Sequence, residues 1–450
     1  MKFYGREEEL LALKRERELL PQGSRLAVLY GRRRVGKTRL ILEFCEKSAL
    51  PYFYFSVRRQ YSEKQLARAW CAELRREYGL AEADEPDRER LCDAVRLAMK
   101  LSKGRPAVFV IDECQELDFI APGFWSGLQE AWDLGKDRSN LLLVMSGSIL
   151  SAMRRIFGSS SEPLYGRADL LLELKPFKPA EIREIFLDRN PAGAPEDLLF
   201  LWCATGGVAR YIEDLASSTP FTEESMVSHV FSPSGAFLQA DGEILLANEF
   251  RAESNVYFQV IQAVANGATR WSEVSNAVEG QLGPYIKRLE TFGLIRRSYP
   301  LLAKPALRSV RYAVADEYLR FWLRFIATPR MQDLAERRDW KNMRRVFSAD
   351  YAAYSGRSLE NWFRELYRTS GDWIDVGGWW DRRGENELDI VAVDSLARKA
   401  EIAEVKRNPK KVSEALLAMK AKAFFDANPS AAGFGLALKS LSLEDMLSRG

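Results

Sequence analysis

Apolar runs and amphipathic stretches alternate along the first third of the chain. Residues 25–30 (RLAVLY), 106–113 (PAVFVIDE) and 141–148 (LLLVMSGS) are apolar runs of the length expected for buried strands. The first run leads directly into a glycine-containing octapeptide, after which RLILEFCEKSA has the spacing of an amphipathic helix. The order strand, glycine loop, helix is therefore predicted at the start of the chain.

The pattern changes in the middle of the chain. Residues 255–315 predict three helices followed by two strands, with Pro284 in the first turn of the third helix and Gly293 after its end. The two strands, LIRRSYP and RYAVAD, can pair as a hairpin. Their order predicts a helical module that carries a β-hairpin.

The last hundred residues predict a helix and then paired strands. Residues 355–369 (SGRSLENWFRELYRT) have an apolar helical face, near which Glu360 lies. Residues 387–393 (ELDIVAV) and 402–406 (IAEVK) follow as strands, and Arg383 and Gly384 lie in a turn before the first of them.

The octapeptide after the first strand carries the clearest chemistry. It reads Gly31-Arg32-Arg33-Arg34-Val35-Gly36-Lys37-Thr38, a GxxxxGKT loop between strand and helix. Its glycines let backbone N–H groups face phosphates, the lysine reaches phosphate oxygens, and the threonine hydroxyl ligates Mg²⁺. The loop predicts ATP binding, the alternative being a glycine turn before a helix.

The strand 106–113 supplies the second half of such a site. Asp112 comes at its carboxyl end, where open α/β sheets bind ligands, and would hold Mg²⁺ through water. Glu113 would orient and deprotonate the attacking water. The alternative is a strand that simply ends in surface acids.

Two further features in this region admit two interpretations each. Ser146 or Ser148, after the strand 141–148, would sense the γ-phosphate or simply lie in a turn. Arg167, in the segment PLYGR, is a candidate arginine finger that neutralises transition-state charge, or a solvated surface charge.

These motifs together resemble a known family. FYGREEELLAL, GRRRVGKTRL, the DE-ended strand, SGS and PLYGR, in this order, are similar to the archaeal-type P-loop ATPase family near the AAA+ and STAND groups, over residues 1–235. The resemblance implies a parallel αβα sheet with a helical lid, a nucleotide role for Arg34 and Arg39, and an Arg167 that acts on nucleotide. The lid motif has Ala209 where the family usually has proline.

The helix–hairpin module resembles a winged helix-turn-helix, at the position where the same family carries one. Its third helix would expose Tyr285, Lys287 and Arg288 to DNA. Between residues 296 and 346, 13 lysines and arginines stand against 5 acids, an excess that suits phosphate contacts. The alternatives are protein binding or a solvated basic surface.

Acids and a lysine converge in the predicted C-terminal strands. Side chains alternate along a strand, so Glu404 and Lys406 share a face that Asp389 can join from the neighbouring strand. Asp389, Glu404 and the Val405 carbonyl would bind Mg²⁺ or Mn²⁺, with Glu360 as a further ligand. Lys406 would position or activate water as the catalytic group.

This arrangement resembles the PD-(D/E)XK nuclease superfamily and, more closely, the domain of unknown function that follows the archaeal-type ATPase module. The similarity covers residues 350–440 and includes GGWWDRRGENELDIVAV. It implies a restriction-endonuclease-like α/β fold. The alternatives are an inactive nuclease fold kept for binding, or a charged surface hairpin.

Composition limits the remaining choices. The 450 residues contain one histidine and five cysteines without a CxxC pair, which excludes zinc sites that need two histidines. Nothing resembles a signal peptide, and no apolar run approaches about 18 residues. A cytoplasmic protein without membrane contact is expected.

We therefore predict a multidomain α/β protein with five segments. They are a P-loop ATPase core (1–175), a helical lid (176–250), a winged helix (251–325), a linker (326–350) and a nuclease-like domain (351–450). The expected function is ATP hydrolysis coupled to metal-dependent DNA cleavage, in DNA processing or defence. The alternative is an ATP-driven switch that binds DNA or a protein partner while the C-terminal domain is catalytically silent. Self-association follows only if Arg167 acts on a neighbouring subunit.

Overall fold

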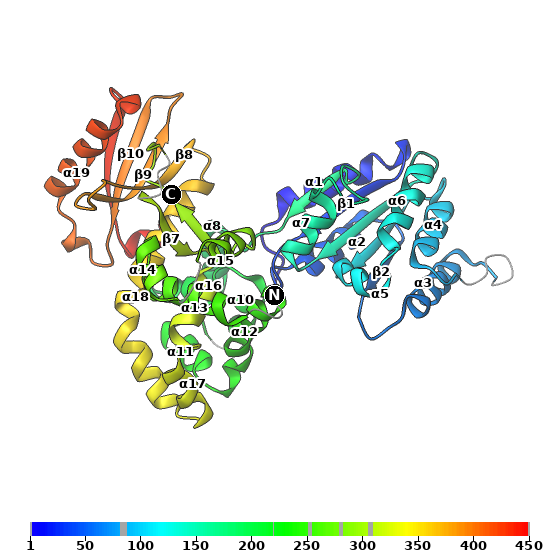
Figure 1. Cartoon of the computed structure of the whole chain (residues 1–450), viewed down its shortest axis with the longest axis horizontal. Helices are drawn as coiled ribbons and strands as arrows, with labels where there is room; N and C mark the ends of the chain where they lie inside the picture. Colours follow the sequence, from blue (N-terminus) through cyan, green and yellow to red (C-terminus); the bar gives the residue numbers. More distant parts are fainter. Residues whose placement is uncertain are drawn as a thin grey trace. The chain divides into compact units, whose positions relative to one another are not determined.

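The computed structural model of the chain describes residues 2–81, 88–218, 220–250, 254–278, 282–304 and 309–448. They form two compact units, one of residues 5–175 and one of residues 176–450 together with the first four residues (Figure 1). The two units are described separately below.

The first unit is a parallel five-stranded sheet between helices. Its strand order is β2-β3-β4-β1-β5, and neighbouring strands run parallel. The strands are β1 (Arg25–Tyr30), β2 (Tyr52–Ser56), β3 (Ala107–Asp112), β4 (Leu141–Gly147) and β5 (Leu170–Glu173). The helices are α1 (Glu7–Glu18), α2 (Lys37–Ser48), α3 (Glu63–Tyr78), α4 (Leu91–Ser102), α5 (Leu117–Ile120), α6 (Phe124–Gly135) and α7 (Leu150–Gly158).

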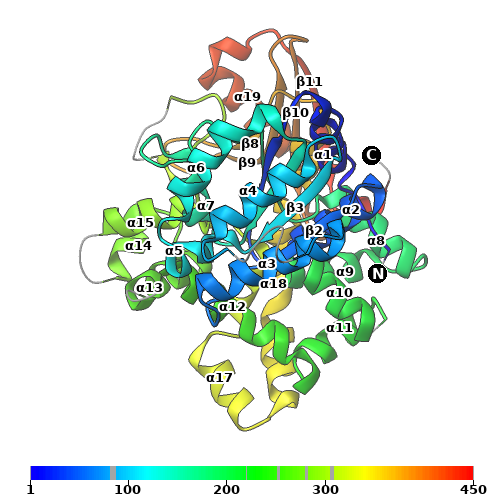
Figure 2. The ribbon, with the colours of Figure 1, turned by 90° about the vertical axis from the view of Figure 1, so that its right-hand side faces the viewer.

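The central strands of this sheet are buried on both faces, which explains their uninterrupted apolar runs. Phe109 and Leu143 belong to a core that also holds Trp70 of α3, Leu91 of α4 and Leu128 of α6. In Figure 2 the helices α3, α4 and α6 lie in front of this sheet. The strand predictions for 25–30, 106–113 and 141–148 agree with β1, β3 and β4.

The second unit begins with helices. These are α8 (Pro179–Arg189), α9 (Pro195–Thr205), α10 (Ala209–Ser218), α11 (Glu223–Val230) and α12 (Ala236–Phe250). Gly206 and Gly207 end α9 with φ of 55° and 76°, and a side chain on Gly207 would meet the Phe177 carbonyl at 2.5 Å. Two left-handed residues in succession fit glycine and turn the chain sharply into α10.

A helix–hairpin module follows in this unit. It contains α13 (Ser254–Ala265), α14 (Trp271–Asn276), α15 (Leu282–Thr291) and the antiparallel pair β6 (Ile295–Ser298) and β7 (Arg311–Val314). The expected three helices and hairpin are therefore present. The connection between β6 and β7 includes residues 305–308, which lie outside the described residues.

The segment 326–350, predicted as a linker that could itself be helical, is largely helical. It contains α17 (Pro329–Glu336) and the first turns of α18 (Trp340–Thr369), after α16 (Glu317–Phe325). Its residues Met331, Leu334, Met343 and Phe347 are all buried in the core of the second unit.

The chain ends in a mixed four-stranded sheet of order β11-β10-β9-β8. After α18 come β8 (Asp375–Trp380), β9 (Glu387–Asp394), β10 (Lys399–Val405), α19 (Glu414–Ala427) and β11 (Gly435–Leu441). Only the β10–β11 pairing is parallel among these strands, and α19 makes the crossover. Phe424 of α19 packs against one face with Ile402, while Trp362 of α18 belongs to the core that holds Ala403.

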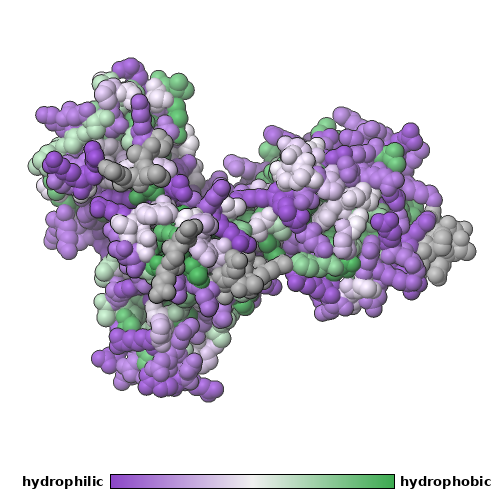
Figure 3. All heavy atoms as spheres, viewed as in Figure 1, coloured by the Kyte–Doolittle hydropathy of each residue, from purple (hydrophilic) through white to green (hydrophobic). Residues whose placement is uncertain are grey.

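No helix of the described residues is long and apolar enough to cross a membrane. On the face drawn in Figure 3, hydrophilic residues predominate and hydrophobic ones form scattered patches.

Candidate functional site

The glycine loop between β1 and α2 can be formed only by a backbone of unusual conformation. A side chain on Gly31 would lie 2.2 Å from the Leu174 carbonyl oxygen, so only glycine fits there. Arg34 and Gly36 have φ of 74° and 101°, in the left-handed region. The loop therefore curls tightly before α2 begins at Lys37.

The lysine of the loop is buried and points into it. The Lys37 Nζ donates to the carbonyl oxygens of Gly31 and Arg32 at 2.9 and 3.1 Å. Burial lowers the pKa of Lys37, an effect that the charges of Glu113 and Asp112 oppose. A cation held by neutral carbonyls inside a loop can exchange them for phosphate oxygens without breaking an ion pair.

The two predicted magnesium ligands meet at the start of α2 and the end of β3. The Thr38 hydroxyl donates to Asp112 Oδ2 at 3.0 Å. The same oxygen accepts a hydrogen bond from the Tyr54 hydroxyl of β2, and the other accepts from the Glu113 N–H at 3.0 Å. One hydroxyl and one carboxylate, next to a phosphate loop, form a donor set that fits Mg²⁺ bound to a nucleotide.

Glu113 is held in a strained position beside this pair. Its φ of 54° is rare for a residue with a side chain, and such strain concentrates at functional sites. Its carboxylate accepts hydrogen bonds from Gln115 Nε2 at 2.7 Å and from the Ser148 hydroxyl at 2.6 Å. Of the two predicted serines, Ser148 thus contacts the candidate base. The Ser146 hydroxyl is buried without a hydrogen-bond partner among the described residues.

The other predicted nucleotide residues lie in different surroundings. Arg39 is exposed on α2 and pairs with Glu43 at 3.7 Å. Arg167 pairs with Asp133 at 2.8 Å and donates to the Pro163 carbonyl.

Arg167 does not reach the phosphate loop of its own chain. The Asp169 N–H, two residues further on, donates to the Leu26 carbonyl at the start of β1, whereas the loop follows the end of β1. A strand of six residues separates these two edges, or roughly 17 Å at the usual rise per residue.

Two residues of this unit were missed by sequence reasoning. Tyr54 belongs to β2, whose parallel pairing with β3 places it near Asp112. The buried Arg6 donates to the carbonyls of Val35 and Lys175 at 3.3 and 2.8 Å, which ties the phosphate loop to the segment after β5. The YGRE motif was the available signal for Arg6.

In the C-terminal domain, the predicted acids and lysine also come together. The Lys406 Nζ lies 3.2 Å from Asp389 Oδ2 and 3.1 Å from Glu404 Oε1. Asp389 Oδ2 also accepts a hydrogen bond from the Val405 N–H at 2.9 Å. The expected shared face of Glu404 and Lys406 is thus present, with Asp389 joining it from β9. We call Glu360, Asp389, Glu404, Lys406 and Lys420 the carboxylate cluster.

Two further members complete this cluster. Lys420 of α19 pairs with Glu404 at 3.1 Å. Glu360 of α18 has its pKa raised to about 7, first by burial and then by the charge of Asp389. The Asp389 pKa is raised mainly by burial, and Lys406 opposes that effect.

The cluster as arranged does not fit a metal ion. No group of three or more histidine, cysteine, aspartate or glutamate side chains in the described part of the chain is placed to hold one. Lys406 lies between Asp389 and Glu404, and Lys420 takes the remaining oxygen of Glu404. Two ammonium groups therefore supply the positive charge that a divalent cation would supply.

The candidate DNA-reading helix is partly exposed. Lys287 and Arg288 of α15 are exposed, whereas Tyr285 is half-buried, with its ring centroid 5.0 Å from that of Tyr257. The prediction that Tyr285 is exposed is therefore wrong.

The hairpin beside this helix is attached to the C-terminal sheet. The Trp380 Nε1 donates to the Ser309 carbonyl at 3.0 Å, and the Leu301 N–H donates to the Gly378 carbonyl at 2.9 Å. Arg308, one of the predicted basic residues, lies outside the described residues.

The phosphate loop, the Thr38–Asp112 contact and the parallel sheet are together typical of a P-loop nucleotide-binding domain. Residues 3–215 match the family described as an ATPase domain predominantly from Archaea. Residues 322–416 match a second family, described as archaeal and bacterial proteins of unknown function. The chain is thus similar to an archaeal ATPase domain over residues 3–215 and to a domain of unknown function over residues 322–416.

Known proteins are similar to this chain over most of its length. An uncharacterized protein of Methanocaldococcus jannaschii, MJECL04, is 27% identical to this chain over 417 residues. The match covers 90% of this chain and 87% of the length of MJECL04. The Walker-type ATPase PABY2304 of Pyrococcus abyssi has a similar structure, with a TM-score of 0.53 at 19% identity, over 72% of this chain and 96% of that one. The ORC2 protein of Aeropyrum pernix gives a TM-score of 0.47 at 14% identity, over 77% and 96% of the two chains.

Proposed function

We propose that this protein hydrolyses ATP at the loop of residues 31–38, with Asp112 and Glu113 as its acidic partners. The observation that carries the proposal is the Thr38–Asp112 hydrogen bond of 3.0 Å beside the buried Lys37. It brings two motifs, 74 residues apart in the sequence, to the edge of the sheet where such folds bind ligands.

Each residue has a distinct part in this proposal. Lys37 and the loop N–H groups hold the phosphates, and Thr38 and Asp112 would hold Mg²⁺, which supplies charge neutralisation when bound. Glu113 accepts the proton of the attacking water, with Gln115 and Ser148 orienting its carboxylate. Tyr54 fixes Asp112 by a hydrogen bond.

The test compares two lysines of the same helix. Lys37→Ala removes the loop cation and should lower ATP affinity and hydrolysis by at least about 100-fold. Lys47→Ala removes an exposed lysine that pairs with Glu43 at 2.9 Å, and serves as the matched control. Hydrolysis that survives Lys37→Ala in full would contradict the proposal.

Arg167 belongs to this proposal as a residue that acts on a neighbouring chain. Its distance from its own phosphate loop supports action in trans, as does its place immediately before β5. If so, hydrolysis per chain rises with protein concentration, and Arg167→Ala abolishes that rise without changing ATP affinity. Hydrolysis independent of concentration would make the Asp133 ion pair a structural contact.

Cleavage of DNA by the C-terminal domain is a second candidate function. Its support is the convergence of Glu360, Asp389, Glu404 and Lys406. The lysine between the acids speaks against a metal in the present arrangement. The alternative is a catalytically silent domain in an ATP-driven switch that binds DNA or a protein.

A single assay separates these readings. Plasmid and single-stranded DNA are incubated with the protein, with Mg²⁺ or Mn²⁺, with and without ATP. Cleavage that disappears in Lys406→Ala but persists in Lys422→Ala, an exposed lysine of α19, would establish the nuclease. Salt-sensitive DNA binding without cleavage would favour the switch, because phosphate contacts release counterions.

A further inference from the structure

A pocket of about 370 Å³ lies within the second unit. One wall comes from the hairpin β6–β7 and the residues after β6, and the other from α18, β8 and β9. The two hydrogen bonds that attach the hairpin to β8 close its side. We call it the arginine pocket.

Positive charge dominates the described lining of this pocket. Two carboxylates, Glu360 and Glu387, contribute to it, against six arginines. The six are Arg296, Arg297, Arg311, Arg357, Arg364 and Arg368. Arg311 pairs with Glu387, and Arg297 pairs with Glu290 at 2.7 Å, so part of the charge is compensated.

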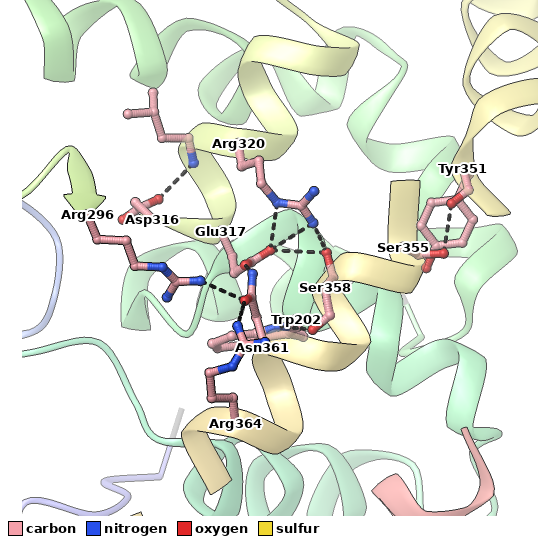
Figure 4. A network of polar contacts seen from close by, with 11 residues as sticks. Trp202, Arg296, Asp316, Glu317, Arg320, Tyr351, Ser355, Ser358, Asn361 and Arg364 are labelled. Atoms are coloured by element: carbon pink, nitrogen blue, oxygen red, sulfur yellow. Dashed lines mark hydrogen bonds and ion pairs between the residues drawn. The ribbon is translucent and has the colours of Figure 1, made fainter. Parts of the chain in front are cut away.

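Two of these arginines, Arg296 and Arg364, donate hydrogen bonds to neutral oxygens. Arg296 and Arg364 both donate to the Asn361 side-chain oxygen, at 2.6 and 3.2 Å, and Arg364 also donates to the Asp389 carbonyl at 2.8 Å. Figure 4 shows the two guanidinium groups converging on Asn361. The Arg364 Nε is buried without a hydrogen-bond partner among the described residues.

This convergence is electrostatically unfavourable without an anion. Burial, with the nearby charge of Arg364, lowers the pKa of Arg296 to about 10. Nearby carboxylates, Glu360 and Asp389 for Arg364 and Glu317 and Glu365 for Arg296, offset the cost of burying these cations only in part, because burial still lowers both pKa values. A dianion in the pocket would supply further negative charge and occupy the free Arg364 donor.

The remaining lining indicates what the anion carries. Tyr299, Leu301, Leu302 and Trp380 contribute aromatic and apolar surface. A volume of about 370 Å³ exceeds what a bare phosphate fills and falls in the range of small-molecule sites. Planar guanidinium forks match phosphate oxygens in pairs.

We propose that the arginine pocket binds a phosphate monoester of nucleotide size, either a free mononucleotide or the phosphorylated end of a nucleic acid strand. The phosphate binds to Arg296 and Arg364, with Arg357 at the rim, and the nucleoside packs on the apolar side. This binding depends neither on ATP hydrolysis nor on strand cleavage.

The test uses two probes in the presence of EDTA, which prevents metal-dependent cleavage. They are hexathymidylates labelled with fluorescein at the 3′ end, one with a 5′-phosphate and one with a 5′-hydroxyl, and fluorescence anisotropy measures their affinity for the full chain. The 5′-phosphate should increase affinity about tenfold, as expected for a charge-assisted hydrogen-bond pair. Binding should persist in Lys37→Ala, which excludes the phosphate loop as the site.

Variants assign the effect to the pocket. Arg364→Gln and Arg357→Gln should abolish the preference for the 5′-phosphate. Arg357 is exposed, so its variant remains informative if Arg364→Gln does not fold. Arg345→Gln removes an exposed arginine of the same helix α18, outside the pocket lining, and should keep the preference.

Competition with AMP distinguishes the two sources of the phosphate. Displacement of the phosphorylated probe by AMP at comparable concentration assigns the pocket to a free mononucleotide, and failure of AMP to compete assigns it to a strand end. Equal affinity for the two probes would overturn the proposal. An equal loss in Arg345→Gln and Arg357→Gln, or the absence of saturable binding, would also overturn it.

Discussion

Lys37 of the phosphate loop and Lys406 of the carboxylate cluster each lie near two acids, but their hydrogen-bond partners differ. Lys37 donates to the backbone carbonyls of its own loop, whereas Lys406 forms ion pairs with Asp389 and Glu404. Burial lowers the pKa of Lys37. Burial also acts to lower the pKa of Lys406, but the charges of Asp389 and Glu404 outweigh burial and raise that pKa.

The difference teaches which site is prepared for a ligand. An anion that displaces the carbonyl oxygens from Lys37 gains an ion pair with it. Asp112 is held in place by hydrogen bonds from the hydroxyl groups of Thr38 and Tyr54. A ligand of the carboxylate cluster must first compete with existing ion pairs. The phosphate loop is thus preorganised for binding, and the cluster is neutralised from within.

The largest effect should come from Glu113→Gln, which tests whether Glu113 is the general base beside the phosphate loop. Loss of the general base should lower kcat for ATP hydrolysis by about 100- to 10,000-fold. ATP affinity should stay unchanged, because Glu113 is proposed to act on water. Gln115→Ala, which removes a hydrogen bond of 2.7 Å to the carboxylate, should have a smaller effect on kcat. Equal rates in Glu113→Gln and the unmodified protein would place the base elsewhere.

The second effect tests whether Lys406 keeps a metal out of the cluster. Lys406→Met leaves Asp389 and Glu404 facing each other, each with a side chain 11% exposed. The variant should lose about 2 kcal/mol of stability without metal, less than for a fully buried pair because Lys406 itself is 35% exposed.

Mn²⁺ should restore this loss and raise the melting temperature of the variant more than that of the unmodified protein. Differential scanning fluorimetry with and without Mn²⁺ measures both effects, and Lys422→Met is the control. Equal responses to Mn²⁺ in both variants would mean that the cluster does not take a metal even when the lysine is removed.

Most residues of the phosphate loop site could be predicted from the sequence alone, because GxxxxGKT and a strand that ends in acidic residues are local patterns with a fixed geometry. It missed Tyr54 and Arg6, whose partners Asp112 and Lys175 are distant in the sequence. The contact between Tyr54 and Asp112 depends on the parallel pairing of β2 with β3, which the pattern of residues 52–56 does not predict.

The sequence predicted that Glu360, Asp389, Glu404 and Lys406 of the carboxylate cluster come together, but it did not predict Lys420 as a member. Strand alternation predicted that Glu404 and Lys406 share a face, as they do. It could not show that Lys420 would turn back from α19 to Glu404. The arginine pocket escaped entirely, since Arg296 and Arg364 meet only through Asn361.

The third prediction concerns Glu360 and the pH dependence of protein stability. It applies to the carboxylate cluster and not to the phosphate loop. The Glu360 pKa of about 7, against 4.5 for an ordinary glutamate, means that the unfolded chain releases this proton before the folded one does. Relative to Glu360→Gln, the unmodified protein should therefore lose stability between pH 4.5 and 7 and change no further above that range.

The expected loss is about 1 to 2 kcal/mol, because Asp389 shares the effect. Urea unfolding at pH 4, 6 and 8 measures it for both proteins. A difference that does not vary with pH would show that Glu360 is ionised normally in the folded state.

The smallest effect concerns what holds Lys406 in place. The next residue, Arg407, pairs with Glu196 of α9, with contacts of 3.0 and 2.5 Å, and also reaches the Ser355 hydroxyl of α18. Lys37, by contrast, donates to carbonyl oxygens of its own loop. A double-mutant cycle of Arg407→Gln and Glu196→Gln should give a coupling energy of about 1 kcal/mol in unfolding experiments, typical of a partly exposed pair. A coupling indistinguishable from zero would mean that the C-terminal domain positions its lysine without the helix α9, and that the two sites are alike in relying only on local structure.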